Sequence, residues 1–140
     1  MFLLDINILI ALADPDHMHH ARAVAFFPQA MKQGWATCPL TENGFLRILG
    51  NPKFPNGPGS PQLARPILDS FCVAPGHQFW ADAITLRDLK LAPVLSAQNH
   101  LTDQYLLALA IHRKGRLATL DEHMDAKATP GGTAAYFVIP

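Results

Sequence analysis

Short apolar runs along this chain alternate with longer stretches in which apolar residues recur every three or four positions. The short runs predict strands at 2–4, 35–38, 71–74, 117–120 and 136–139. The longer stretches predict helices at 7–12, 20–32, 41–49, 61–70, 78–89 and 103–114. Strands that alternate with helices are typical of parallel crossover units, so the pattern predicts an α/β sandwich.

Local signals predict where several of these helices begin and end. Asn7, Thr41 and Thr102 are the side chains expected to cap three of them, because Asn and Thr oxygens accept bonds from free N–H groups at a helix start. Pro28 predicts a kink or a break in the helix at 20–32. Residues 50–61 are rich in Pro and Gly, so they predict an exposed loop.

Four carboxylates stand where predicted strands meet predicted helices. They are Asp5, Glu42, Asp103 and Asp121. The carboxyl ends of parallel strands share one edge of a sheet, and this edge is where ligands bind in such folds. An acid beside an apolar segment is costly unless it is paired, hydrogen-bonded or bound to a cation. The pattern therefore predicts one shared site for a hard divalent metal ion.

Each acid also has a simpler explanation. Glu42 and Asp103 follow predicted caps, where a negative charge complements the helix dipole by about 0.3–1 kcal/mol. Asp121 is also explained as the start of a turn, and Asp125 is placed to reach the rim of a cluster. The simpler explanation fails for Asp5, which lies inside an apolar stretch, so it must face a polar crevice.

Composition narrows the class of protein. A chain of 140 residues with 49% hydrophobic and 16% charged residues predicts a single folded domain over 1–140. The net charge is zero, which provides no support for a general nucleic-acid affinity but allows a local basic patch. Cys38 and Cys72 are expected to be reduced thiols in a cytoplasmic protein, and the first residues predict neither a signal peptide nor a membrane span.

The histidines give no regular metal-binding spacing. His17, His19 and His20 precede a predicted helix and fit an exposed turn at least as well as a metal tract. His100 and His123 lie near acids, where a surface role is the simpler explanation. The chain also contains no GxGxxG, GxxxxGK[ST] or GxSxG sequence, so dinucleotide binding, P-loop hydrolysis and serine hydrolysis have no motif support.

The segments around the four acids resemble the four motifs of PIN domains, in order and with ordinary spacing. These segments are residues 3–12, 39–47, 101–110 and 117–121. The chain is most similar to VapC-type toxins, the ribonuclease halves of bacterial and archaeal toxin–antitoxin modules. Two features depart from the common pattern: Ile6 stands where many relatives have Thr, Ser or Ala, and the 50–61 loop belongs to a variable region.

The resemblance implies a three-layer α/β/α sandwich with a central, mainly parallel sheet and helices on both faces. It also implies a Mg²⁺- or Mn²⁺-dependent endoribonuclease, a homodimer in the cytoplasm, and inhibition by a cognate VapB-type antitoxin. The expected substrate is a structured RNA such as tRNA or rRNA, because a neutral protein has little unspecific affinity for RNA.

The expected roles of individual residues follow from the four acids. Asp5 and Asp103 are the first choice as direct metal ligands, and Glu42 and Asp121 complete the site. Asn7, Thr102 and Thr119 are candidates for orienting these carboxylates, although capping and strand hydrogen bonds explain them equally well. Arg47 and Lys53 are candidates for contacts with RNA phosphates, with Arg22 as a further candidate for RNA or antitoxin.

Two other classes of function remain open. A metal-dependent phosphatase on another α/β scaffold also gathers acids at strand ends, but it would normally have an acid two residues after the first, where this chain has Asn7. A catalytically inert interaction module would use the acids only to hold a structural ion. Cleavage of RNA, release of phosphate from small esters, or neither would distinguish the three.

Overall fold

One parallel sheet organises the protein, in a computed structural model that describes residues 1–140. Its strands are β1 (Phe2–Leu4), β2 (Trp35–Thr37), β3 (His77–Phe79), β4 (Arg116–Thr119) and β5 (Tyr136–Val138). The α-helices are α1 (Ile6–Ala13), α2 (His20–Gln33), α3 (Pro39–Leu49), α4 (Pro61–Cys72), α5 (Leu101–His112) and α6 (Gly132–Ala135). Two 3-10 helices lie at η1 (Gln98–His100) and η2 (Ala126–Ala128).

The strand order is β3-β2-β1-β4-β5, and every neighbouring pair is parallel. Along the chain, β2 and β3 are added on one side of β1, and β4 and β5 are then added on its other side. The direction of building therefore reverses between β1 and β4, where Leu3 lies opposite Leu117. Such a switch point leaves a crevice at the carboxyl ends of the two strands.

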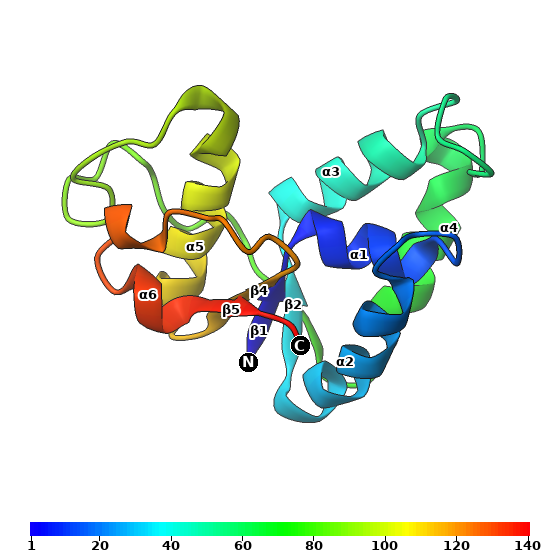
Figure 1. Cartoon of the computed structure of the whole chain (residues 1–140), viewed down its shortest axis with the longest axis horizontal. Coiled ribbons are helices and arrows are strands. Elements are labelled where there is room, and N and C mark those ends of the chain that lie inside the picture. Colours follow the sequence, from blue (N-terminus) through cyan, green and yellow to red (C-terminus); the bar gives the residue numbers. More distant parts are fainter.

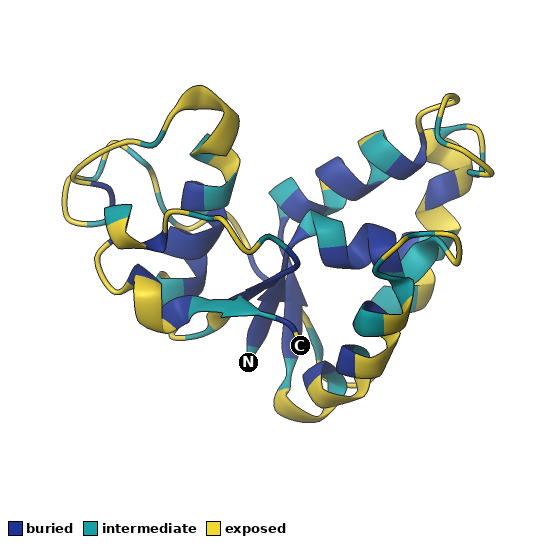
Figure 2. Ribbon diagram, viewed as in Figure 1, coloured by how far each residue is buried: buried dark blue, intermediate teal, exposed yellow.

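Helices cover both faces of the sheet. Figure 1 shows α1 to α4 on one side and α5 and α6 on the other, which confirms the predicted three-layer α/β/α sandwich. Side chains alternate along β1: Phe2 and Leu4 enter a core with α1 to α4, whereas Leu3 enters a second core with α5. Both faces of the central strands are buried, as Figure 2 shows, so most residues of these strands are apolar.

Two predicted elements between α4 and α5 are wrong. The predicted strand at 71–74 is instead the end of α4 and a turn, and the predicted helix at 78–89 is instead β3 followed by irregular chain. Side chains in this segment bond their own backbone: Thr85 accepts from the Arg87 N–H at 3.2 Å, and Asp88 accepts from the Lys90 N–H at 2.9 Å. These local bonds compete with a helical hydrogen-bond pattern.

The predicted caps are also wrong, although the helices they belong to exist. Asp5, not Asn7, caps α1, and His100, not Thr102, precedes α5. Cys38 is the cap of α3, and Thr41 lies one turn in, where its hydroxyl accepts from the Cys38 N–H at 2.9 Å. The helix α2 continues through Pro28 without a break.

No helix in the structure combines the length and the apolar character needed to cross a bilayer. The longest, α2, has 14 residues, against the roughly 20 apolar residues that a membrane span requires.

Gly76 allows the close approach that starts β3. Its φ is +79°, and a Cβ there would lie 2.5 Å from the Met31 carbonyl oxygen, while its own carbonyl accepts from the Trp35 N–H at 3.0 Å. Gly59 also has a positive φ, +92°, but a Cβ there would meet nothing within 4 Å.

We therefore expect Gly76→Ala to lower the free energy of unfolding by at least about 2 kcal/mol, through backbone strain and overlap with a carbonyl. Gly59→Ala is the matched control and should cost only the strain, about 1 kcal/mol. Urea unfolding of both variants measures the difference. Equal losses would show that the contact with Met31 is unimportant.

Candidate acidic metal site

Asp5 places a buried carboxylate at the carboxyl end of β1. Its backbone is extended, and Oδ1 accepts from the Ile6 N–H at 2.7 Å, so the side chain caps α1. The residue is only 6% exposed. A strand that turns directly into a helix thus fixes the carboxylate at the switch point of the sheet.

The second oxygen of Asp5 is bound by side chains from two different elements. Oδ2 accepts from Asn7 Nδ2 at 2.9 Å and from Thr119 Oγ1 at 2.7 Å. The Thr119 hydroxyl in turn accepts from Asn7 Nδ2 at 2.9 Å and from the Asp121 N–H at 3.0 Å. Asp5, at the end of β1, and Asp121, just after β4, are therefore joined through the single hydroxyl of Thr119.

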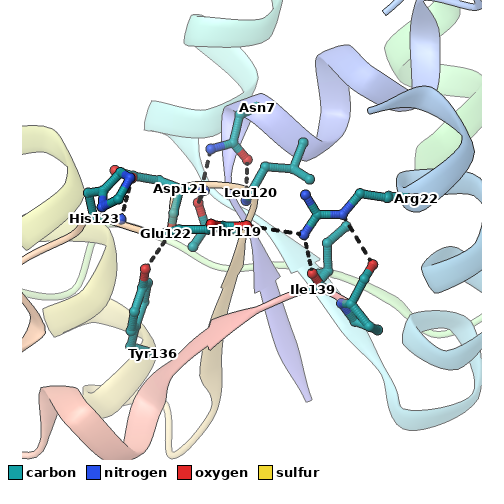
Figure 3. A network of polar contacts seen from close by, with 10 residues as sticks. Asn7, Arg22, Thr119, Leu120, Asp121, Glu122, His123, Tyr136 and Ile139 are labelled. Atoms are coloured by element: carbon teal, nitrogen blue, oxygen red, sulfur yellow. Dashed lines mark hydrogen bonds and ion pairs between the residues drawn. The ribbon is translucent and has the colours of Figure 1, made fainter. Parts of the chain in front are cut away.

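The chain after β4 is held at several points, as Figure 3 shows. Asn7 Oδ1 accepts from the Leu120 N–H at 3.1 Å, and the Tyr136 hydroxyl donates to the Asp121 carbonyl. The Asp121 carboxylate itself accepts from the His123 N–H at 2.8 Å. Sequence alone gave no signal for Tyr136, because its contact depends on β5 lying beside β4.

Arg22 ties the same region to α2. Its guanidinium donates to the Ile139 carbonyl at 2.7 Å and to the Pro140 carbonyl at 3.3 Å, and it lies 3.8 Å from the Glu122 carboxylate. Arg22, a predicted candidate for contacts with RNA or antitoxin, thus makes these contacts within the chain.

Asp103 approaches the site from the other side of the sheet. It lies in the first turn of α5 and is half-buried, with His100 Nδ1 3.8 Å from its Oδ2. Burial and the nearby Asp121 raise the pKa of Asp103, while His100 opposes the rise. Electrostatic coupling thus connects Asp103 with Asp121.

Burial and like charge act together on Asp5. Burial is the largest cause that raises its pKa from 3.8 to about 6, and the charges of Asp103 and Asp121 add to the rise. Hydrogen bonds from Thr119 and the Ile6 N–H act in the opposite direction. Asp5, Asp103 and Asp121 therefore form one electrostatic group, which we call the aspartate cluster.

Glu42, in the first turn of α3, bonds a different strand. Its carboxylate accepts from Thr37 Oγ1 at 2.7 Å, and the same hydroxyl lies 2.8 Å from His77 Nε2. Glu42, Cys72 and His77 have ligand atoms within 4.8 Å of one another, and no other His, Cys, Asp and Glu group of three or more does. Hydrogen bonds and charge effects thus link three of the four predicted acids, while the Glu42 carboxylate bonds Thr37 at the end of β2.

The aspartate cluster suits a hard divalent cation. A buried carboxylate with two like charges nearby is stabilised when a cation offsets the repulsion, and carboxylate oxygens are the ligands that Mg²⁺ prefers. The ligand atoms of the three aspartates are not all within 4.8 Å of one another, so a shared ion would require their side chains to move closer together.

The remaining predicted residues divide into two groups. Asn7 and Thr119 both bond Asp5, which suits the predicted orienting role, whereas Thr102 is exposed. Arg47 and Lys53 are exposed and line one cavity at the far end of α3 from the sheet.

Other sequence-based expectations concern cysteine and histidine. Cys38 and Cys72 are free thiols, as expected, and burial raises the pKa of each. His17 and His19 lie in the turn before α2, and the His20 ring lies 2.7 Å from the Ala11 carbonyl oxygen. These three histidines form no group with metal-ligand spacing.

A family model described as PIN domain matches residues 2–130. The chain belongs to the PIN domain family. Ribonuclease VapC44 of Mycobacterium tuberculosis is 38% identical over 133 residues, which cover 94% of this chain and 93% of that protein. Ribonuclease VapC38 of the same organism is 44% identical over 122 residues, or 86% and 85% of the two chains. The resemblance to VapC-type PIN domains is thereby confirmed.

Solved structures share the fold of this PIN domain. Mycobacterium tuberculosis VapC20, described as a sarcin-ricin loop cleaving toxin, superposes with a TM-score of 0.63 at 10% identity and covers 99% of this chain and 97% of its own. A chain of the Rickettsia felis VapBC2 complex bound to promoter DNA gives 0.58 at 13% identity, with 86% and 87% covered. At these identities the likeness concerns the fold alone.

The raised pKa of Asp5 predicts a specific pH dependence. The folded protein binds this proton more tightly than the unfolded chain, so the stabilising effect is complete below about pH 4 and is lost as pH rises through about 6. A shift of about two units corresponds to about 3 kcal/mol. In EDTA, the free energy of unfolding of the native protein should therefore decrease between pH 4 and pH 8 by more than that of Asp5→Asn.

Asp69→Asn, at an exposed position on α4, is the control and should follow the native curve. Near pH 8, Asp5→Asn should be as stable as the native protein or more stable, because the variant buries no charge and is not repelled by Asp103 and Asp121. A curve for Asp5→Asn parallel to the native one would contradict the raised pKa.

A second prediction concerns Thr119, which is fully buried. Thr119→Val keeps the shape but leaves the Asp121 N–H without its acceptor and removes a donor from Asp5, so it should cost about 1–3 kcal/mol. It should also weaken Mn²⁺ binding about 10–100-fold, as loss of a group that orients a ligand does. Calorimetry measures both. Thr119→Ser, which retains the hydroxyl, should bind Mn²⁺ nearly as the native protein does.

Proposed function

We propose that this PIN domain is a metal-dependent endoribonuclease that acts as the toxin of a toxin–antitoxin module. The observation that carries the proposal is the aspartate cluster, formed from the end of β1, the start of α5 and the chain after β4. Relatives that align over most of the chain are named ribonucleases, which supports RNA as the substrate.

Asp5, Asp103 and Asp121 are proposed to hold Mg²⁺ or Mn²⁺ through carboxylate oxygens. When bound, such an ion offsets the repulsion among the carboxylates, activates water for attack on phosphorus and stabilises the charge that develops on the phosphate. Asn7 and Thr119 keep the Asp5 carboxylate in a single orientation through their hydrogen bonds to Oδ2.

Glu42 stays a predicted ligand that would need to leave its hydrogen bond with Thr37. The first turn of α3 begins at the same edge of the sheet as α1, so a change of side-chain rotamer is the required movement. The alternative is that Glu42 stabilises the contact between α3 and β2 rather than binding metal.

The expected partners follow from the same family. A VapB-type antitoxin is the proposed inhibitor, supported by the VapBC2 complex that shares this fold. We propose a structured RNA such as tRNA or rRNA as the substrate, the cytoplasm as the location and a homodimer as the active form. Phe26 is buried in the core and therefore does not supply the surface of that dimer.

The test is cleavage of labelled tRNA and rRNA by the purified protein with Mg²⁺, Mn²⁺ or EDTA. The native protein should cut RNA only with a divalent ion, and Asp5→Asn or Asp103→Asn should lower the rate at least about 100-fold, because each removes a ligand charge. Asp69→Asn should retain the native rate. Glu42→Gln distinguishes the two roles of Glu42. If Glu42 is a metal ligand, the variant should stay folded but bind Mn²⁺ more weakly. If Glu42 only stabilises the fold, the variant should be less stable but, where folded, should bind Mn²⁺ as the native protein does.

The same proteins should be assayed with small phosphate esters. Release of phosphate from these esters without RNA cleavage would identify a phosphatase. Absence of both activities, with Mn²⁺ still bound, would identify an inert metal-binding module.

A further inference from the structure

A cavity of about 200 Å³ lies against the aspartate cluster on its α5 side. Its walls are the loop at 94–97, the first turns of α5 and the segment 123–128. Asp103 lines it directly, and so does His123, whose N–H donates to the Asp121 carboxylate. We propose that this cavity binds one unpaired nucleobase of the RNA, next to the phosphate that is cut. The inference rests on the proposed function and adds a recognition site to it.

The size of the cavity suits a single flat ring system. A protein cavity of about 150 Å³ is sufficient to bind benzene, and drug-sized ligands need about 300 Å³ or more. A cavity of about 200 Å³ lies between these values. It therefore matches one base better than a larger ligand.

The lining suits a ring with apolar faces and polar edges. Six of the twelve lining residues are hydrophobic, including Leu95 and Met124, and the polar ones include His100 and His123. Val94 and Leu95 are adjacent in the chain, both line the cavity, and both are more than half exposed. Apolar contact and imidazole stacking recognise base faces, while the imidazole nitrogens can bond base edges.

The wall formed by the 94–97 loop is fixed before any ligand arrives. Gln104, which is 4% exposed, donates from Nε2 to the Val94 carbonyl at 2.7 Å and accepts at Oε1 from the Ser96 N–H at 2.9 Å. Both ends of one buried amide thus hold the loop against α5. A site held in this way loses little conformational entropy on binding.

The position next to the acids identifies the nucleotide concerned. Because Asp103 belongs to both the cavity and the aspartate cluster, a base inside it carries a phosphate that lies at the cluster. A base reaches such a cavity only when it is unstacked, which occurs in loops, bulges and ends of RNA. The cavity would therefore select a cut site in a single-stranded loop.

An apolar protein side chain is the less suitable occupant. It would cover the Asp103 carboxylate without offering a compensating charge, which is costly. A nucleotide arrives together with its phosphate and the divalent ion, so the charge of Asp103 remains compensated when the cavity fills.

The experiment combines changes in the protein with changes in the RNA. A cut site is first mapped in tRNA or rRNA with the native protein and Mn²⁺, and a synthetic stem-loop spanning it is made with single abasic nucleotides around the cut. One abasic position should slow cleavage about tenfold, within the range of about 5- to 150-fold expected for loss of one base contact.

Ala128→Leu fills the cavity from η2, where Ala128 is half-buried. This variant should cleave the intact RNA about tenfold more slowly than the native protein does. On the critical abasic RNA, the two proteins should differ by no more than about twofold, because both changes remove the same contact. Leu95→Ala, at an exposed position, gives the same test if Ala128→Leu does not fold. Ala83→Leu, exposed in a separate cavity, is the matched control and should behave as the native protein.

The outcomes separate the two proposals. A native protein that cuts no RNA with Mn²⁺ would overturn the proposed function. Normal native cleavage would instead overturn only the base site if no abasic position matters, or if Ala128→Leu slows intact and abasic RNA equally. Unchanged cleavage with weaker inhibition by the antitoxin would assign the cavity to a protein partner, which also contradicts the base site.

Discussion

The hydrogen bond between Thr119 and Asp5 joins two strands whose residues are far apart in the chain but adjacent in the sheet. It depends on the parallel pairing of β1 with β4, which puts the carboxyl ends of both strands at one switch point. The pairing places Asp5 and Asp121 near each other, because Asp5 directly follows β1 and Asp121 lies two residues after the end of β4. The helix α5 then needs only to place its first turn beside them.

The arrangement of the three aspartates destabilises the folded protein when Asp5 is ionised. A carboxylate with a pKa near 6 is partly protonated in mildly acidic solution and repels its neighbours at neutral pH. The cost is tolerated because two large cores, one on each face of the sheet, hold the strands in place. A cation that binds the folded protein would reduce the cost, so binding and stability are expected to be linked. The cavity beside Asp103 adds a neutral recognition surface to this charged centre.

Much of this could be predicted from the sequence. The apolar runs before Asp5 and Asp121 are buried strands, and the acids after them meet, because strand periodicity and the parallel rule are strong local signals. Three features could not be predicted. The segment at 71–89 lacks a clear period, so β3 was missed, and the rotamer that turns Glu42 toward Thr37 depends on the contact between α3 and β2. The role of Gln104 depends on a loop that the sequence pattern did not define.

The order of the strands has a consequence for how the protein is made. The strand β1 occupies the middle of the sheet, and one of its two neighbours, β4, is synthesised more than a hundred residues later. Until then, Asp5 lacks Thr119, and the crevice between the two strands has only one wall. A nascent chain is therefore unable to assemble the acidic centre until β4 has been synthesised and has paired with β1.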